Sequence, residues 1–406
     1  MRGTAKDGLT REISQMGGSR SQRKHRPTMA TTIEKLPDHL LSNILVRVPA
    51  RTLAQMRSVS KPLNVLLSQP SFIKTHLHRS IKTDDEILLV FKDGVSSEVT
   101  VHPSRSPHLE LPNFIQLPVY DNPGYECKGH ELIGAVNGLI CFSYHLANRG
   151  YIIQIWNPSI SALLVVPRLV PSGGFLPEYR FGFDPKNDDY KLLRHELFVD
   201  ENKPDERHVL VQVYSMRKRC WKLITERFPE HLGMFGVDKV CGDGHDGRLH
   251  WLCFHADDYN IEMIGAFDLG AETFSEIALP VDNIPHGNVL GVLGGKLCLM
   301  SCLKDHNFEV WLLNEYGNAE SWAKLHVFSL FSANNMSPFG FTLSNEFLFT
   351  SSDVLSLYDP IAANVKSFMF KVGRHAKVVP YVDSLVWITP DKRKKKRKRC
   401  MVPSKS

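Results

Sequence analysis

Apolar side chains recur at helical spacing near the start of the chain and at strand spacing over most of the rest. Within residues 33–78, one set of apolar positions falls at i, i+1, i+4, i+5 and i+8, the face of a single helix. These positions are Leu40, Leu41, Ile44, Leu45 and Val48. Pro37 suits the first turn of this helix, and Pro49 ends it.

Three more short helices are predicted downstream of Pro49. Thr52 is a candidate N-cap for the second helix, Ser60 with Pro62 marks the start of the third, and Ser71 is a candidate N-cap for the fourth. Helices this short bury little apolar surface by themselves. The pattern therefore predicts a small helical module whose apolar face is covered by a partner.

After residue 84 the pattern changes to short runs that are rich in β-branched and aromatic residues. Examples are EILLVF (86–91), GLICFSY (138–144), LHWLCF (249–254) and FEVWLL (308–313), separated by clusters of Gly, Pro, Asn and Asp. Such runs are typical of strands joined by turns. Residues 85–388 are therefore predicted to be all β.

These strands form a repeat in which the second strand of each unit ends in an aromatic residue. The five aromatic anchors are spaced 58, 53, 44 and 47 residues apart and are Trp156, Tyr214, Phe267, Trp311 and Tyr358. Periods of about 40–50 residues with four strands per unit indicate a β-propeller. About 300 residues at roughly 50 per blade predict about six blades. The predicted fold is an α+β multidomain chain, a small helical module followed by a propeller-like domain.

The positive charge lies in two tails. Residues 392–406 carry nine cations and no anions, and residues 1–28 carry seven cations and two anions. Subtracting these from totals of 49 and 43 leaves 33 cations and 41 anions, a net charge of −8, for residues 29–391. An acidic body disfavours nucleic acid as a partner. Residues 1–29 and 391–406 are predicted to be disordered basic tails.

The densest part of the second tail is a run of eight cations. It comprises Lys392, Arg393, Lys394, Lys395, Lys396, Arg397, Lys398 and Arg399. Such a run is typical of a nuclear-import signal. A merely solvated tail and a nonspecific polyanion contact are the alternatives. We expect the protein in the nucleus and cytoplasm, and no apolar run is long enough for a membrane span.

Motifs for common chemistries are missing from the sequence. It has no GxSxG, HExxH, Walker A or dinucleotide-binding pattern. His245, His250 and His255, with Cys241 and Cys253, match no zinc spacing. We therefore predict no catalytic residues, no metal and no cofactor, and the sequence assigns no substrate-binding residue.

The helical segment LPDHLLSNILVRVPARTLAQMRSVSK resembles an F-box, the motif by which substrate receptors dock on the Skp adaptor of cullin-based ubiquitin ligases. The matching parts are the Leu-Pro start, the two-Leu helix, the break at 46–49, and the segments 57–61 and 69–77. The family usually has an aromatic residue where this chain has Leu63. The series GLIC…WNP and FGFDP (181–185) is similar to the plant F-box-associated, kelch-like domain.

The resemblance implies an F-box over residues 30–78, a Skp-type adaptor and through it a cullin as partners, and an unknown protein substrate bound by the propeller. The implied adaptor-facing or supporting residues are Leu36, Pro37, Leu40, Ile44, Leu45, Val48, Pro49, Leu53, Val59 and Leu63. The chain would then be a non-catalytic receptor subunit. A propeller-fold enzyme and a nuclear binding module unconnected to a ligase remain alternatives.

Overall fold

The computed structural model describes residues 36–83, 87–91, 98–103, 113–118, 127–146, 150–169, 177–200, 203–225, 228–234, 245–280, 287–303, 307–329, 336–372 and 376–388. The chain divides into two compact units between Ile44 and Leu45. Both basic tails, including residues 392–399, lie outside the described residues.

The described part of the first unit is dominated by helix α2 (Asp38–Leu45), of which all but the last residue belongs to this unit. The amides of Leu40 and Leu41 donate to the Pro37 carbonyl at 3.0 and 3.1 Å. The helix therefore begins directly after Pro37. Its acidic first residue suits the positive end of the helix dipole.

The second unit begins with helices α3 (Ala50–Val59), α4 (Lys61–Leu67) and α5 (Pro70–Lys82). Ser60 precedes α4 as predicted, but the predicted N-caps Thr52 and Ser71 are wrong. Helix α3 starts after Pro49 and α5 starts after Gln69. Pro70 occupies the first turn of α5, where its missing N–H costs nothing. The start of α3 is completed from a distant part of the chain, as shown below.

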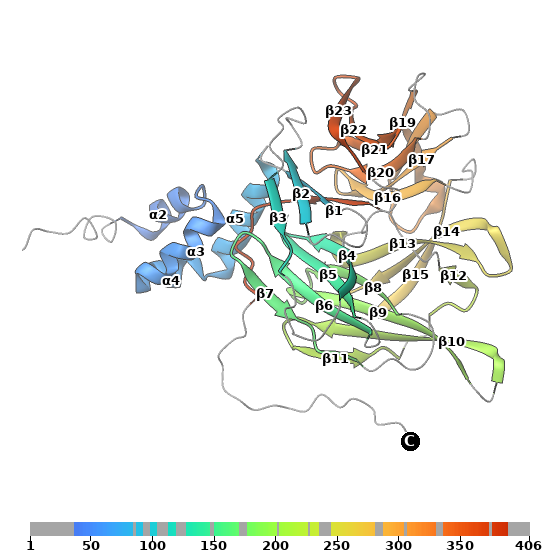
Figure 1. Cartoon of the computed structure of the whole chain (residues 1–406), viewed down its shortest axis with the longest axis horizontal. Coiled ribbons are helices and arrows are strands. Elements are labelled where there is room, and N and C mark those ends of the chain that lie inside the picture. The colour runs from blue at the N-terminus through green and yellow to red at the C-terminus, as the bar shows by residue number, and fades with distance from the viewer. Residues whose placement is uncertain are drawn as a thin grey trace, which may run out of the picture. The chain divides into compact units, whose positions relative to one another are not determined.

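Six four-stranded antiparallel sheets follow, arranged as the blades of a propeller (Figure 1). Blade 1 contains β24 (Lys377–Tyr381), β1 (Ile87–Phe91), β2 (Glu98–Pro103) and β3 (Asn113–Gln116). Blade 2 contains β4 (Cys127–Val136), β5 (Leu139–Leu146), β6 (Gly150–Asn157) and β7 (Ala162–Val165). Blade 3 contains β8 (Glu178–Asp184), β9 (Asp189–Asp200), β10 (Lys203–Ser215) and β11 (Cys220–Leu223).

The other three blades keep the order of the chain. Blade 4 contains β12 (Leu232–Met234), β13 (Arg248–His255), β14 (Asp258–Asp268) and β15 (Thr273–Ala278), with the short helix η1 (His245–Gly247) before β13. Blade 5 contains β16 (Asn288–Leu293), β17 (Lys296–Cys302), β18 (Asn307–Leu313) and β19 (Trp322–Ser329), with η2 (Ala319–Ser321) before β19. Blade 6 contains β20 (Ser337–Phe341), β21 (Phe347–Ser351), β22 (Val354–Asp359) and β23 (Asn364–Lys371). The prediction of about six blades is confirmed.

The core of the propeller consists of six apolar clusters, each made by the facing sides of two neighbouring blades. Five of the clusters contain one predicted aromatic anchor each. In order around the ring these are Trp156, Tyr214, Phe267, Trp311 and Tyr358. All five are buried, with at most 9% of the residue exposed. The sixth cluster, between blades 6 and 1, includes Phe368 and Leu88 and has no predicted anchor.

Candidate functional site

Four of the predicted docking residues belong to the first unit, on or just before α2. Leu36 and Pro37 are exposed, as are Leu40 and Ile44, which leave 44% and 55% of their surface in solvent. Large apolar side chains grouped in this way are typical of a surface that a partner covers. On this unit, α2 therefore presents leucine and isoleucine side chains that are available for docking.

The other six predicted residues belong to the second unit and differ in exposure. Leu45 and Leu53 are buried, at 4% and 0%, so in this fold they support the helices from within. Val48 and Leu63 are half-buried, whereas Pro49 and Val59 are exposed. Leu63 thus fills a half-buried position where the family usually has an aromatic ring.

Sequence reasoning missed one apolar residue of α4. Val65 leaves 64% of its surface exposed, and Val59 at the end of α3 leaves 79% exposed. The spacing of Leu63, Leu66 and Leu67 identified the inner face of α4, and Val65 lies off that face. The signal that could have identified Val65 is an apolar residue at a helix position outside the buried face.

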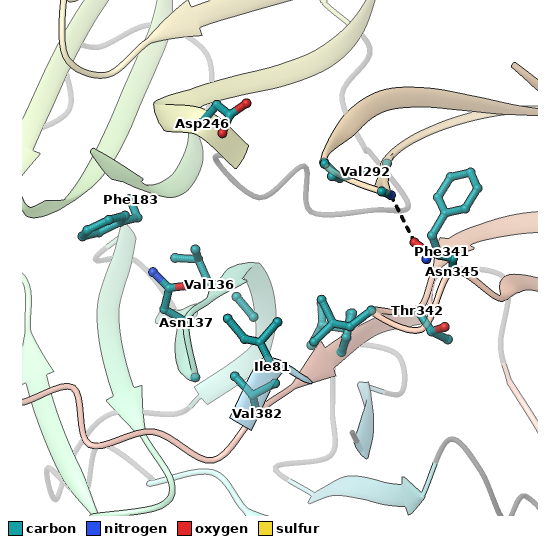
Figure 2. A pocket seen from close by; sticks show the side chains of 18 of the residues that line it. Ile81, Val136, Asn137, Phe183, Asp246, Val292, Phe341, Thr342, Asn345 and Val382 are labelled. Atoms are coloured by element: carbon teal, nitrogen blue, oxygen red, sulfur yellow. Dashed lines mark hydrogen bonds between the residues drawn. The ribbon is translucent and has the colours of Figure 1, made fainter. Parts of the chain in front are cut away.

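A cavity of about 580 Å³ is lined by residues of all six blades and by Ile81 near the end of α5 (Figure 2). Ile81 of α5 lines it, together with apolar side chains of the blades such as Val136, Phe183 and Phe341. This cavity was not predicted, because it is assembled from α5 and from short segments of all six blades that are far apart in the sequence.

Several polar groups of the cavity come from tight turns. Asn137 and Gly138 have φ values of 53° and 76°, the pair of positive angles that a type I′ hairpin requires, and Asn-Gly is a preferred dipeptide for it. Gly294 forms part of a similar turn, and its amide donates to Asn345 Oδ1 at 3.1 Å (Figure 2). The cavity is thus lined by apolar side chains together with amide groups, the Asp246 carboxylate and the Thr342 hydroxyl.

Blade 3 contains an ionisable pair, the buried His195 and the half-buried Glu178, beside Trp251 of blade 4. His195 Nε2 lies 3.1 Å from Glu178 Oε2, and the His195 ring is stacked on Trp251. Burial lowers the pKa of His195, although the hydrogen bond and charge of Glu178 oppose this shift. Burial by itself would raise the pKa of Glu178, but the hydrogen bond and charge of His195, with Arg180 and Lys377, bring it below its usual value. Only 5% of His195 is exposed, so this pair serves packing between blades.

The candidate metal ligands do not come together in the described part of the chain. His250 Nε2 lies 3.0 Å from the Tyr316 hydroxyl, and His255 lies beside His231. Cys241 and the side chain of His245 lie outside the described residues. Among the residues that the structure describes, no group of three or more His, Cys, Asp or Glu side chains is arranged to hold a metal ion. No described helix is both long enough and apolar enough to cross a membrane.

Comparison with known families agrees with this architecture. Residues 33–75 match the F-box domain, and residues 86–397 match the F-box associated beta propeller domain. The chain belongs to the F-box proteins with an F-box associated beta propeller. The helices α2 to α5 and the six blades are thus the two modules of this family.

Relatives of this F-box protein are found in Arabidopsis thaliana. It is 28% identical over 319 residues to F-box protein CPR1, covering 71% of this chain and 72% of the relative. It is 26% identical over 307 residues to F-box/kelch-repeat protein At3g23880, covering 71% of this chain and 78% of that protein. Among solved structures, YjhT is similar at a TM-score of 0.38 and 11% identity, over 59% of this chain and 83% of that one.

Proposed function

We propose that this F-box protein is the substrate-recognition subunit of a Skp–cullin–F-box ubiquitin ligase. The helices dock on a Skp-type adaptor, and through it on a cullin, while the propeller binds a protein substrate for ubiquitination and proteasomal degradation. The chain itself performs no chemistry. It contributes proximity, by raising the effective concentration of substrate lysines near the ubiquitin-charged partner subunit.

The exposed apolar side chains of the F-box helices carry this proposal. Leu40 and Ile44 on α2, and Val59 and Val65 on the second unit, all leave over two fifths of their surface in solvent. Burying such side chains against an adaptor gains about 25 cal/mol for each Å² of apolar surface removed from water. On each unit, helices that expose such side chains suit helix-on-helix docking.

A double charge substitution tests adaptor docking. Leu40→Asp with Ile44→Asp should abolish co-purification with a Skp adaptor, since uncompensated carboxylates would be buried in an apolar contact. The matched control is His39→Asp with Asn43→Asp, which adds acidic groups at two other exposed positions of the same helix. Adaptor binding by a folded Leu40→Asp/Ile44→Asp protein, equal to that of the control, would count heavily against the assignment.

The substrate is sought by proximity labelling in the presence of a proteasome inhibitor. The full chain is compared with a chain that lacks residues 30–78. A genuine substrate should be labelled by both proteins, because the propeller is intact in each, but should accumulate ubiquitin only with the full chain. Labelled proteins whose ubiquitination does not differ between the two would contradict the receptor role.

The proposed location is the nucleus and cytoplasm. The support is the run of eight cations at residues 392–399, which has no acidic neighbours on its C-terminal side. An uninterrupted run of cations complements the charge of an acidic import receptor.

A further inference from the structure

The segment that follows the last strand, residues 382–388, lies between the propeller and helices α3 and α5 of the second unit. We name it the strap. Its middle is held by blade 2, where Asn157 Nδ2 donates to the carbonyls of Ser384 and Val386 at 3.0 and 2.9 Å. Its end is held by blade 3, where Arg219 Nη2 donates to the Ile388 carbonyl at 3.0 Å. Asn157 is fully buried, so these bonds are shielded from water.

The opposite side of the strap contacts both ends of helix α3. The Ala50 amide, at the start of the helix, donates to Asp383 Oδ2 at 2.6 Å. Arg57, in the last turn, places its guanidinium carbon 4.1 Å from the centre of the Trp387 ring. Pro49 precedes the helix and provides no side-chain cap. Asp383 thus supplies the missing cap, and its carboxylate also suits the positive end of the helix dipole.

Helix α5 is joined to the same segment through the apolar cluster between blades 2 and 3. Val386 and Ile388 of the strap are members of this cluster, and Ile73 and Leu77 of α5 pack against it. Lys74 adds an ion pair to Asp188 of blade 3 at 3.1 Å, but both side chains are exposed, so this pair contributes little. The strap is therefore the layer shared by the helices and the propeller.

We infer that the strap fixes helices α3–α5 to the propeller in one orientation, with Asp383 and Trp387 as its positioning residues. Asp383 contacts the first residue of α3, and Trp387 contacts Arg57 in its last turn. Because the helix is held at both ends, it cannot pivot about either contact alone. In the proposed ligase, this orientation would set the direction in which the propeller presents a bound substrate. That consequence rests on the proposed function, whereas the fixed orientation does not.

Glycine 138 permits the close approach on the propeller side. A Cβ atom at this position would lie 2.3 Å from Ser384 Cβ and 2.6 Å from the Val382 carbonyl oxygen. The residue also has a φ of 76°, which other residues rarely adopt. The same glycine therefore serves the blade 2 hairpin and the seat of the strap.

The inference is tested on the full chain by a distance distribution. Spin labels are attached through unnatural amino acids at Ser71 of α5 and Asp257 of blade 4, both exposed, and the distance is measured by double electron–electron resonance. The original protein should give one narrow distribution. The Asp383→Ala/Trp387→Ala double variant should give a broad one, and Arg57→Ala should broaden it without any change to the propeller.

Conservative variants separate positioning from general stability. Asp383→Asn keeps an oxygen acceptor and Trp387→Phe keeps an aromatic face, so the combination of the two should restore the narrow distribution. Glu320→Ala, an exposed acidic residue of blade 5, is the control. Hydrogen exchange of a peptide that starts at α3 should accelerate about 2- to 30-fold in Asp383→Ala, the range expected for a lost cap, but not in Glu320→Ala.

Two results would overturn the inference. One is an unchanged narrow distribution in both the folded double variant and Arg57→Ala. The other is broadening that the Asn and Phe variants do not reverse.

Adaptor co-purification, measured on the same proteins, should be unchanged throughout. Failure of the original protein to bind adaptor would reject the proposed function while leaving the distance result to stand.

Discussion

Leu89 of β1 and Val379 of β24 lie directly opposite each other in the sheet of blade 1, although almost the whole propeller separates them in sequence. Both are buried, at 1% and 3% exposure. The pairing completes the first blade with the last strand, so the ring is closed by main-chain hydrogen bonds and by the apolar clusters on both sides of blade 1. Closure pairs the edge of β1 that an open ring would leave exposed.

Breaking this closure should destabilise the whole ring. Leu89→Ala should cost about 2–5 kcal/mol, because it leaves a cavity in the cluster between blades 1 and 2. The measurement is the denaturant dependence of tryptophan fluorescence, with Leu325→Ala, a half-exposed residue of the outer strand β19, as the control. A loss no larger than that of the control would show that blade 1 does not limit stability.

The aromatic anchors should be structural. Trp311→Ala should cost about 3–5 kcal/mol, since Trp311 lies in the cluster between blades 4 and 5. Trp156→Ala should have a similar effect between blades 1 and 2. Melting temperature is the measurement. If substrate binding were lost without a change in melting temperature, the rings would belong to a binding site instead.

Mild acid should destabilise the protein through His195. Its pKa is lowered by burial in the folded state, so the unfolded chain takes up a proton near pH 6.5 and the folded chain does so only at lower pH. Unfolding therefore becomes more favourable as the pH falls below about 6.5. The melting temperature should fall less steeply between pH 7.5 and 5.5 in His195→Gln than in the original protein.

The control for this prediction is His78→Gln, which makes the same change at an exposed histidine of α5. His130, whose pKa is also lowered by burial, remains in every variant and adds a common slope. Equal slopes for His195→Gln and the original protein would mean that His195 is not the titrating group.

Removing residues 391–406 should move the protein from nucleus to cytoplasm with little change in melting temperature, because the segment carries few apolar residues. Changing the eight cations to Gln should have the same effect, whereas shuffling the order of Lys and Arg should not. A truncated protein that still concentrates in the nucleus would reject the import signal. The remaining alternative, a polyanion contact, would show binding that weakens steeply with added salt.

The sequence by itself determined the features that depend on neighbouring residues. Short runs rich in β-branched and aromatic residues predicted the strands, and the spacing of Trp156 to Tyr358 predicted about six blades. Asn137-Gly138 supplied the residue pair that a type I′ turn requires. These features follow from side-chain period and local backbone preference, which a single sequence displays directly.

Only the tertiary structure decided how distant segments meet. The predicted N-cap at Thr52 was wrong because Asp383, contributed by the strap, completes the start of α3. In the same way, no local pattern connects the strands that pair Leu89 with Val379. Nor does one connect Ile81 of α5 with the blade residues that line the same cavity. Period and propensity specify each element, but contacts between residues far apart in the chain depend on how the closed ring brings its two ends together.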